Sequence, residues 1–346
     1  MDTRDDAEQA ELRRSARQLA RELGPPTVAA LSDATRTKRL VGAVRDAGWL
    51  ELRNDAGDRR PLASGVEAAI VADALGASVA DVAFAGPLLG ADLARRAGWS
   101  PGRDAVVAFE PSLVDLPVVE GDATDTPLWA VDAGRDADGA PEVLVLAPAE
   151  RGWRLARLHV AATATDDDGT DLTRAVRTVP AGSAVEPVPG APTVLTDDDR
   201  AAWTALGLAL AAADLVGVMR GALDTTVAYA AERRQYGVPV GSFQAVQHLL
   251  AEACCLAEGA HSVALHASWA VDALPAREAL AAGRIAKAYC ARAARTVCET
   301  AVQVHGGIGN TWECMVHVFL RRALLSEQWF GDDGAQLRAI ERARLG

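Results

Sequence analysis

The spacing of apolar positions predicts helices at both ends of the chain and strands between them. In Ala7–Leu23 apolar residues recur every three or four positions, which places them on one face of a helix. Three further N-terminal segments are predicted as helices from caps and from Gly or Pro at their ends. These predicted helices are Ala7–Leu23, Ser32–Asp46 with Ser32 as its cap, Ser64–Leu75 and Pro87–Ala97. Further along, the apolar runs are short and bounded by Asp, Gly and Pro clusters, which is typical of strands. The predicted strands are Ala105–Phe109, Leu128–Val131, Val143–Leu146 and Ala175–Val179.

From Thr196 onward the helical spacing returns and predicts four long helices. Thr196 precedes three aspartates, a capped and acidic helix start that suits the helix dipole. Four long helices with short connections indicate an antiparallel bundle. The first of these helices runs from Thr196 to about Gly237, and the others run from a cap at Ser242 to about Ala273, from Pro275 to His305, and from Glu313 to Phe330, before a short closing helix.

This order of elements indicates a multidomain α+β protein. We expect an N-terminal helical domain over residues 1–101, a middle β domain of the barrel or sandwich type over 102–195, and a C-terminal four-helix bundle over 196–346. A chain of 346 residues is long enough to bury the core that such an arrangement needs.

Composition and charge argue against several classes of function. The net charge of −12 disfavours binding to nucleic acid or to an anionic membrane. No run reaches the roughly 18 uninterrupted apolar residues of a membrane span, and the charged residues from Asp2 onward argue against a signal peptide. The five cysteines have no metal-ligand spacing. We therefore predict no metal site and buried, reduced thiols, which are typical of the cytoplasm.

Two C-terminal segments carry candidate binding chemistry. The segment AERRQYGVPVGSFQAVQHLLAE, residues 231–252, ends one helix and begins the next. Its Arg233 and Arg234 fall in the predicted last helical turn, where cations complement the dipole, and a guanidinium fork there can also hold a phosphate. The segment QVHGGIGNTWE, residues 303–313, follows the third long helix. Its glycines permit positive φ and let a ligand approach the backbone N–H groups.

Together these two segments resemble the signatures of the acyl-CoA dehydrogenase family. Thr170–Arg174, with the sequence TDLTR, is similar to a segment that recurs near the end of that family's β domain, and the order of the three domains matches over the whole chain. The resemblance implies a flavoenzyme that desaturates an acyl-CoA thioester, with FAD lying between subunits and an electron-transfer flavoprotein or similar acceptor. It assigns the FAD pyrophosphate to Arg233, and further FAD contacts to Gln235, Tyr236, Gln244, Gln303, Gly306 and Gly307.

The resemblance also implies a carboxylate base, which this sequence lacks at both of the family's usual positions. The family places the base near the end of the last bundle helix or early in the first one, and here these positions hold Phe330 and Gly207. Three other carboxylates are candidates. Asp214 lies two helical turns, or about 11 Å, beyond Gly207, and Glu327 and Asp332 lie beside Phe330.

The flavin side of the family's site is also altered, whereas the side for the ADP half of FAD is retained. The β-domain stretch that contacts the flavin in the family is matched only by Ala108–Leu116, without its Gly-Ser-Asp part. This asymmetry predicts the smaller subunit of a heteromeric α2β2 dehydrogenase, similar to actinobacterial enzymes for steroid side-chain thioesters, that lends half an FAD site to a catalytic partner. Two alternatives remain: a homo-oligomeric dehydrogenase with Asp214 as a relocated base, and a helical interaction protein without flavin or catalysis.

Overall fold

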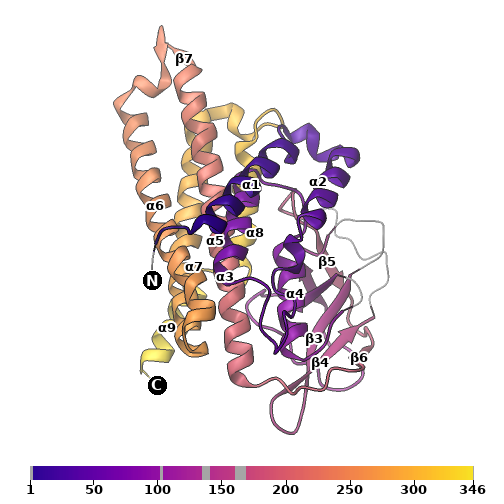
Figure 1. The fold of residues 1–346 in the computed structure, drawn as a ribbon. Coiled ribbons are helices and arrows are strands. Elements are labelled where there is room, and N and C mark those ends of the chain that lie inside the picture. Colours follow the sequence, from indigo (N-terminus) through magenta and orange to yellow (C-terminus); the bar gives the residue numbers. More distant parts are fainter. Residues whose placement is uncertain (1–2, 102–103, 135–140, 160–168, 346) are drawn as a thin grey trace.

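The computed structural model describes residues 3–101, 104–134, 141–159 and 169–345. Two Asp- and Gly-rich segments predicted as turns, residues 134–142 and 164–173, lie partly outside these ranges. Within them the elements follow the predicted order of helices, strands and long helices. Figure 1 shows the long C-terminal helices side by side, with the sheet and the N-terminal helices along one flank and a hairpin at the tip.

Four helices and two short 3-10 turns form the N-terminal part. The prediction that Ser32 caps the second helix is wrong, because Asp33 accepts the hydrogen bonds from the backbone N–H groups of Thr35 and Arg36, both at 3.0 Å. A carboxylate suits this position because it is an acceptor and its charge complements the helix dipole. The elements are α1 (Ala7–Leu23), η1 (Val28–Ser32), α2 (Ala34–Asp46), η2 (Trp49–Glu51), α3 (Gly65–Ala77) and α4 (Ala85–Arg96).

The middle of the chain forms a mixed six-stranded sheet in the order β5–β2–β1–β3–β4–β6. β1 and β3 pair in parallel, with Ala105 opposite Glu142, and the other neighbours pair antiparallel. The sequence did not predict β4, because its arginines interrupt what would otherwise be an apolar run. The strands are β1 (Ala105–Phe109), β2 (Leu128–Val131), β3 (Glu142–Pro148), β4 (Trp153–Leu158), β5 (Val176–Val179) and β6 (Val185–Pro187).

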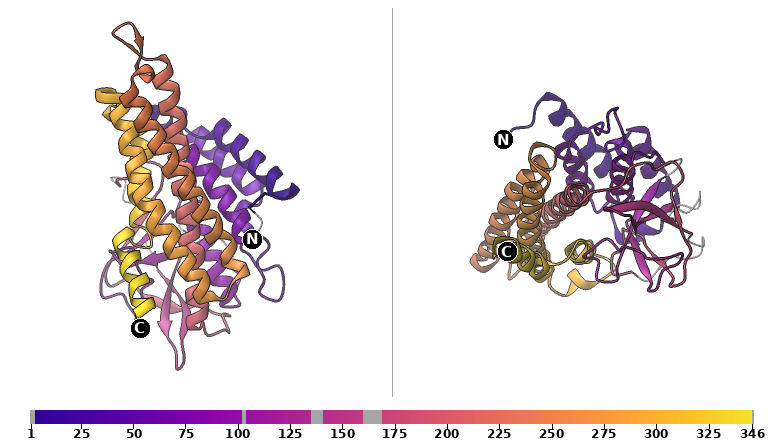
Figure 2. Two further views of the ribbon diagram at one scale, coloured as in Figure 1. Left: turned by 90° about the vertical axis from the view of Figure 1, so that its left-hand side faces the viewer. Right: turned by 90° about the horizontal axis from the view of Figure 1, so that it is seen from below.

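The C-terminal part is a bundle of helices that lie side by side in both views of Figure 2. As predicted, Thr196 caps the first helix, through a capping box with Asp199. The predicted cap of the second helix is wrong, because Ser242 donates to the carbonyl of Pro239 and the helix begins at Gln244 without a side-chain cap. The helices are α5 (Asp197–Glu232), α6 (Gln244–Ala273), α7 (Ala276–His305), α8 (Val316–Gln328) and α9 (Asp333–Leu345), with a short turn η4 (Gly306–Asn310) after α7.

α5 packs against the N-terminal helices as well as the bundle. Its Gly217 and Gly221, one turn apart, lie directly on the backbone of α3 at Asp73 and Ala77, where any Cβ would collide. α5 has the length and apolar composition of a membrane span, but 89% of its most apolar 18-residue window is buried inside the protein. Packing against α3, α6 and α7 therefore accounts for its apolar residues.

The prediction of buried cysteines is correct for only part of the set. Cys290 and Cys298 of α7 are buried, whereas Cys254 and Cys255 of α6 are exposed, and all five cysteines are free thiols. Burial raises the pKa of both buried thiols to about 12, so they stay protonated at neutral pH.

Candidate functional site

The chain turns from α5 to α6 through a β-hairpin that projects beyond the bundle (Figure 1). β7 (Arg234–Gln235) pairs antiparallel with β8 (Val238–Pro239). Tyr236 and Gly237 between them both have positive φ, 52° and 82°. Two residues with positive φ suit the type I′ turn that the twist of a two-residue hairpin favours. The hairpin thereby presents Tyr236, which is 94% exposed, at the tip of the molecule.

This hairpin leaves the Arg233 side chain free for a ligand. α5 ends at Glu232 and Arg233 is already extended, with ψ 126°, so the prediction that Arg233 and Arg234 lie in the last helical turn is wrong. The backbone of Arg233 donates to Tyr229 and accepts from Val240. Its guanidinium is exposed and has no hydrogen bond or ion pair within the described part of the chain. The other candidate residues of this segment are also exposed, namely Gln235, Tyr236 and Gln244.

The end of α7 exposes bare backbone. Gly306 has φ 65° and ends the helix by donating to the carbonyl oxygens of Val302 and Gln303. A Cβ added at Gly306 or Gly307 would meet no described atom within 4 Å, whereas one at Gly309 would press on Val302. The positive φ explains the glycine at 306, and the open space beside it leaves room for a ligand to reach the backbone.

The hairpin and the glycine segment meet at the same end of the bundle. The ring of Tyr229, one turn before Arg233, stacks on His305 with 4.1 Å between the ring centroids. His305 is buried and its Nδ1 lies 2.8 Å from the carbonyl oxygen of Ala301. Burial lowers the pKa of His305, so the ring is neutral at pH 7 and packs as an aromatic surface. The free guanidinium and the open glycines therefore flank one pair of stacked rings.

The two positions that hold the base in the family face each other in the structure. A Cβ added to Gly207 would overlap the Phe330 ring, and Phe330 is 2% exposed. The ring lies against Phe109, Trp203 and Trp329, with centroid separations of 5.1, 5.5 and 5.6 Å. Aromatic side chains therefore fill the space between these two positions.

The β-domain segment Ala108–Leu116 borders this aromatic cluster from the other side. Phe109 is part of the aromatic cluster, and the backbone N–H of Phe330 donates to the carbonyl of Leu113 at 2.8 Å. Phe330 and Leu113 both have positive φ, 64° and 55°, which is uncommon for residues with bulky side chains. Their hydrogen bond joins the segment to the turn after α8, and Val114, Leu116 and Phe330 line an adjoining pocket of about 640 Å³.

Lys287 of α7 holds the backbone of the same turn, a role that sequence reasoning missed. Its buried Nζ donates to the carbonyl oxygens of Glu327 at 2.6 Å and Gly331 at 2.7 Å. Burial lowers the pKa of Lys287 to about 7, because the ammonium is removed from water and its partners are neutral carbonyls. A single lysine on the Ala-rich buried face of α7 was the signal available in the sequence.

Asp214 lies in a buried ion network, which disfavours it as a base. It is 1% exposed, and its Oδ1 accepts from Arg322 Nη2 at 2.7 Å and lies 2.9 Å from Arg174 Nη2. Its Oδ2 accepts from Ser326 Oγ at 2.8 Å. Burial alone would raise the pKa of Asp214, but Arg174 and Arg322 outweigh it and hold the pKa below its ordinary value. A carboxylate stabilised in this way is a weak proton acceptor.

The two other candidate carboxylates are engaged as well. Glu327 accepts a fork from Arg295, with Nε at 3.0 Å and Nη2 at 2.7 Å. Asp332 Oδ1 accepts from the backbone N–H of Ala335 at 2.7 Å, at the start of α9. These contacts give both side chains structural tasks and disfavour either one as a base.

Arg322 links the Thr170–Arg174 segment to the helices around Asp214. Its guanidinium donates to the carbonyl of Ala80 at 2.8 Å and to Thr173 Oγ1 at 3.1 Å, in addition to Asp214. One side chain thus joins α8, α5, the N-terminal helices and the end of the β region. Sequence reasoning missed this junction, for which the signal was a lone aspartate inside the apolar stretch of α5.

The helical region, mixed sheet and C-terminal bundle, with an arginine and a glycine motif at one end, define the acyl-CoA dehydrogenase class of fold. Residues 205–345 match the family model described as acyl-CoA dehydrogenase, C-terminal domain. The chain is 34% identical over 275 residues to acyl-CoA dehydrogenase IpdE2 of Mycolicibacterium smegmatis, covering 80% of this chain and 78% of that relative. The chain therefore belongs to the acyl-CoA dehydrogenase family of oxidoreductases.

Other relatives extend the comparison. Acyl-CoA dehydrogenase FadE34 of Mycobacterium tuberculosis is 36% identical over 221 residues, which is 62% of this chain but only 30% of that relative's length. The ChsE4–ChsE5 complex from Mycobacterium tuberculosis is similar with a TM-score of 0.77 at 24% identity, covering 99% of this chain and 98% of that chain. The Tcur3481–Tcur3483 steroid ACAD variant has a TM-score of 0.75 at 22% identity, covering 97% of each chain. These likenesses confirm the predicted fold.

Proposed function

We propose that this chain is a subunit of a heteromeric, FAD-dependent acyl-CoA dehydrogenase and contributes the ADP-half FAD site to a catalytic partner. The observation that carries the proposal is the Phe330 ring, which packs on Gly207 and occupies the place of the family's base. A chain without a positioned base needs a partner to remove the substrate's α-proton. The similar structures named for pairs of proteins, ChsE4–ChsE5 and Tcur3481–Tcur3483, support a partner of the same fold.

The residues at the tip of the bundle fit the ADP half of FAD. The free guanidinium of Arg233 would hold the pyrophosphate, because its fork donates two hydrogen bonds to phosphate oxygens. The open backbone at Gly306 and Gly307 would accommodate the adenosine end. FAD supplies the hydride acceptor of the desaturation reaction when it is bound. Further contacts are proposed for Gln235, Tyr236, Gln244 and Gln303.

The proposed reaction of the assembly is α,β-desaturation of an acyl-CoA thioester. Steroid side-chain thioesters are the proposed substrate class, supported by the similarity to a steroid ACAD. Electrons would pass to an electron-transfer flavoprotein or a similar acceptor. We place the α2β2 assembly in the cytoplasm, where the five free thiols would stay reduced.

The proposal is tested by co-expressing the chain with the acyl-CoA dehydrogenase-like protein of an adjacent gene. The number of flavins per assembly is then measured. We expect the chain alone to be colourless and the complex to be yellow, with half as many flavins as subunits. Arg233→Ala should remove FAD from the complex without dissociating it. The control is Arg39→Ala, which removes an exposed arginine of α2 and should leave the flavin in place. Equal flavin content in both variants would refute the half-site.

Two other outcomes would select the alternatives. A yellow and active homo-oligomer of this chain would mean that a carboxylate elsewhere acts as the base, against the contacts of Asp214. A chain that binds no flavin with any partner would be a helical interaction protein on the same fold.

A further inference from the structure

A row of arginines runs along one face of α1. Arg13, Arg17 and Arg21 are four residues apart, which places them on the same side of the helix at intervals of about 6 Å. Arg220 reaches the row from α5, through the carboxylate of Asp73. A groove of about 600 Å³ lies along this face, in a chain whose net charge is −12. The groove therefore concentrates a charge opposite in sign to that of the whole chain.

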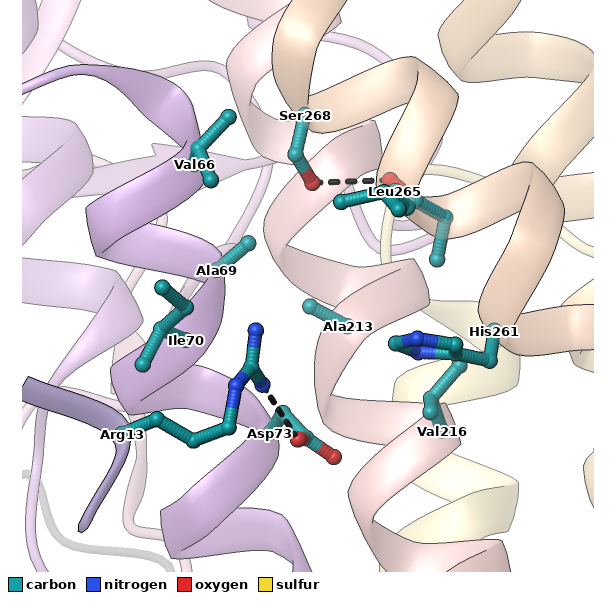
Figure 3. A pocket seen from close by; sticks show the side chains of 11 residues that line it. Arg13, Val66, Ala69, Ile70, Asp73, Ala213, Val216, His261, Leu265 and Ser268 are labelled. Atoms are coloured by element: carbon teal, nitrogen blue, oxygen red, sulfur yellow. Dashed lines mark hydrogen bonds and ion pairs between the residues drawn. The ribbon is translucent and has the colours of Figure 1, made fainter. Parts of the chain in front are cut away.

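One buried carboxylate is shared among three of these arginines. Both oxygens of Asp73 accept from Arg220 Nη1 at 2.7 Å. Asp73 Oδ2 also lies 3.4 Å from Arg13 Nη1 and 3.8 Å from Arg17 Nη2. Figure 3 shows Arg13 reaching toward Asp73 at the edge of a small cavity between α1, α3, α5 and α6. Because one carboxylate carries one charge, Asp73 offsets Arg220 and leaves Arg17 with a distant, shared partner.

The charges along the groove do not balance. It is lined by four arginines and two carboxylates, namely Arg13, Arg14, Arg17, Arg21, Asp5 and Glu22. Asp5 pairs with Arg13 at 2.6 Å, and Arg14 pairs with Glu11 on the adjoining face. Burial and then the charge of Arg220 lower the pKa of Arg17, which Asp73 offsets only in part. The positive charge of Arg17 is therefore incompletely compensated.

We propose that this groove binds an oxyanion of the phosphate class, held by Arg17 and Arg21 with Arg13 and Arg220 behind them. The planar guanidinium fork matches two phosphate oxygens. The side chains of Arg13, Arg17 and Arg220 are recessed, with 17%, 37% and 30% of their surface exposed. Partly buried charges are screened by salt less than exposed ones, so these arginines repel one another. A bound dianion would relieve this repulsion, because its charge is opposite in sign.

His261 of α6 provides a reporter for the site. Its ring lies on the far side of the small cavity from Arg13 and Asp73 (Figure 3). Burial and then Arg220 lower the pKa of His261, with Arg13 adding to the effect and Asp73 and Glu258 opposing it. A bound oxyanion should raise the pKa of His261, because it compensates the positive charges that disfavour the imidazolium.

Isothermal titration of the full chain with inorganic phosphate and with pyrophosphate tests the site, at an ionic strength held constant with sodium chloride. Arg17→Gln and Arg21→Gln should each weaken binding about tenfold or more, because each removes a charge-assisted contact. Arg39→Gln removes the same charge from an exposed position on α2, outside the groove, and should leave the affinity unchanged. Circular dichroism establishes that the variants fold.

A second readout is the pKa of His261, measured by NMR and assigned with a His261→Gln variant, which should rise when phosphate is added. Equal affinity of the Arg17→Gln and Arg39→Gln variants overturns the proposal, as does the absence of binding by the wild type at millimolar phosphate. Binding of poly-glutamate without binding of phosphate also overturns it, since the groove would then be a docking surface for an acidic protein segment.

Discussion

Gly207→Ala should destabilise the protein, although alanine is the better helix former. Inside a helix this substitution normally adds about 1 kcal/mol to stability. At Gly207 the new Cβ overlaps the ring of Phe330. The ring packs against Phe109, Trp203 and Trp329, each of which is 1% exposed, so any shift of the ring disturbs buried aromatic contacts. Overpacking costs about 1–3 kcal/mol, and with the cost at the upper end of that range the net loss is about 2 kcal/mol.

A double variant isolates the contact between the two positions. Phe330→Ala alone should cost about 3–5 kcal/mol, because it leaves a cavity among three aromatic rings. In that background the Gly207→Ala methyl group finds open space and should stabilise by about 1 kcal/mol. The two substitutions should therefore show a coupling energy of about 3 kcal/mol.

Urea unfolding followed by tryptophan fluorescence measures these differences, because Trp203 and Trp329 lie at the contact. Gly42→Ala is the matched control, since Gly42 lies inside α2 and its added Cβ would meet no described atom within 4 Å. If Gly207→Ala stabilises as much as Gly42→Ala, or if the coupling is absent, the Phe330 ring does not fill the family's base site.

Two further predictions concern buried charges. Asp214→Asn should cost about 3 kcal/mol or more at neutral pH, because it removes the carboxylate nearest to the buried guanidinium groups of Arg174 and Arg322. Since the pKa of Asp214 is lowered by folding, its stabilising effect is present above the unfolded pKa and is lost as the pH falls through the folded one. The gap between the unfolding midpoints of wild type and Asp214→Asn should close in acid, and a constant gap would contradict this role. For Lys287, folding lowers the pKa from 10.5 to about 7, so between these values the unfolded chain binds more protons. The stability of the wild type relative to Lys287→Met should therefore rise with pH across that range, and a flat difference in unfolding midpoints would contradict the burial of the amine.

Local patterns in the sequence predicted most of the element order. α1 and the first two strands have the predicted bounds, because helical and strand periodicity is visible within a few residues. The caps were less predictable. Ser32 and Asp33 are adjacent and chemically suitable, and only the backbone path shows which of them is at the helix start. β4 contains two arginines among its apolar residues, so a search for short apolar runs does not detect it.

For the candidate FAD residues too, the sequence predicted the motif, and the structure decided its local geometry. The sequence placed Arg233 in the last helical turn, but the structure puts it just outside the helix, and its guanidinium has no hydrogen bond or ion pair to the residues that the structure describes. That difference depends on the hairpin, whose turn requires positive φ at Tyr236 and Gly237. The stack of Tyr229 on His305 could not be expected from either motif alone, because it depends on how α5 and α7 pack.

By itself, the sequence determined that Gly207 and Phe330 offer no carboxylate, since side-chain chemistry follows directly from residue type. Only the tertiary structure decided that these two residues touch, because their contact depends on how α5 packs against the turn after α8. The same holds for Asp214, whose carboxylate is visible in the sequence. Its two arginine partners come from elements distant along the chain, and their charges make it part of an ion network.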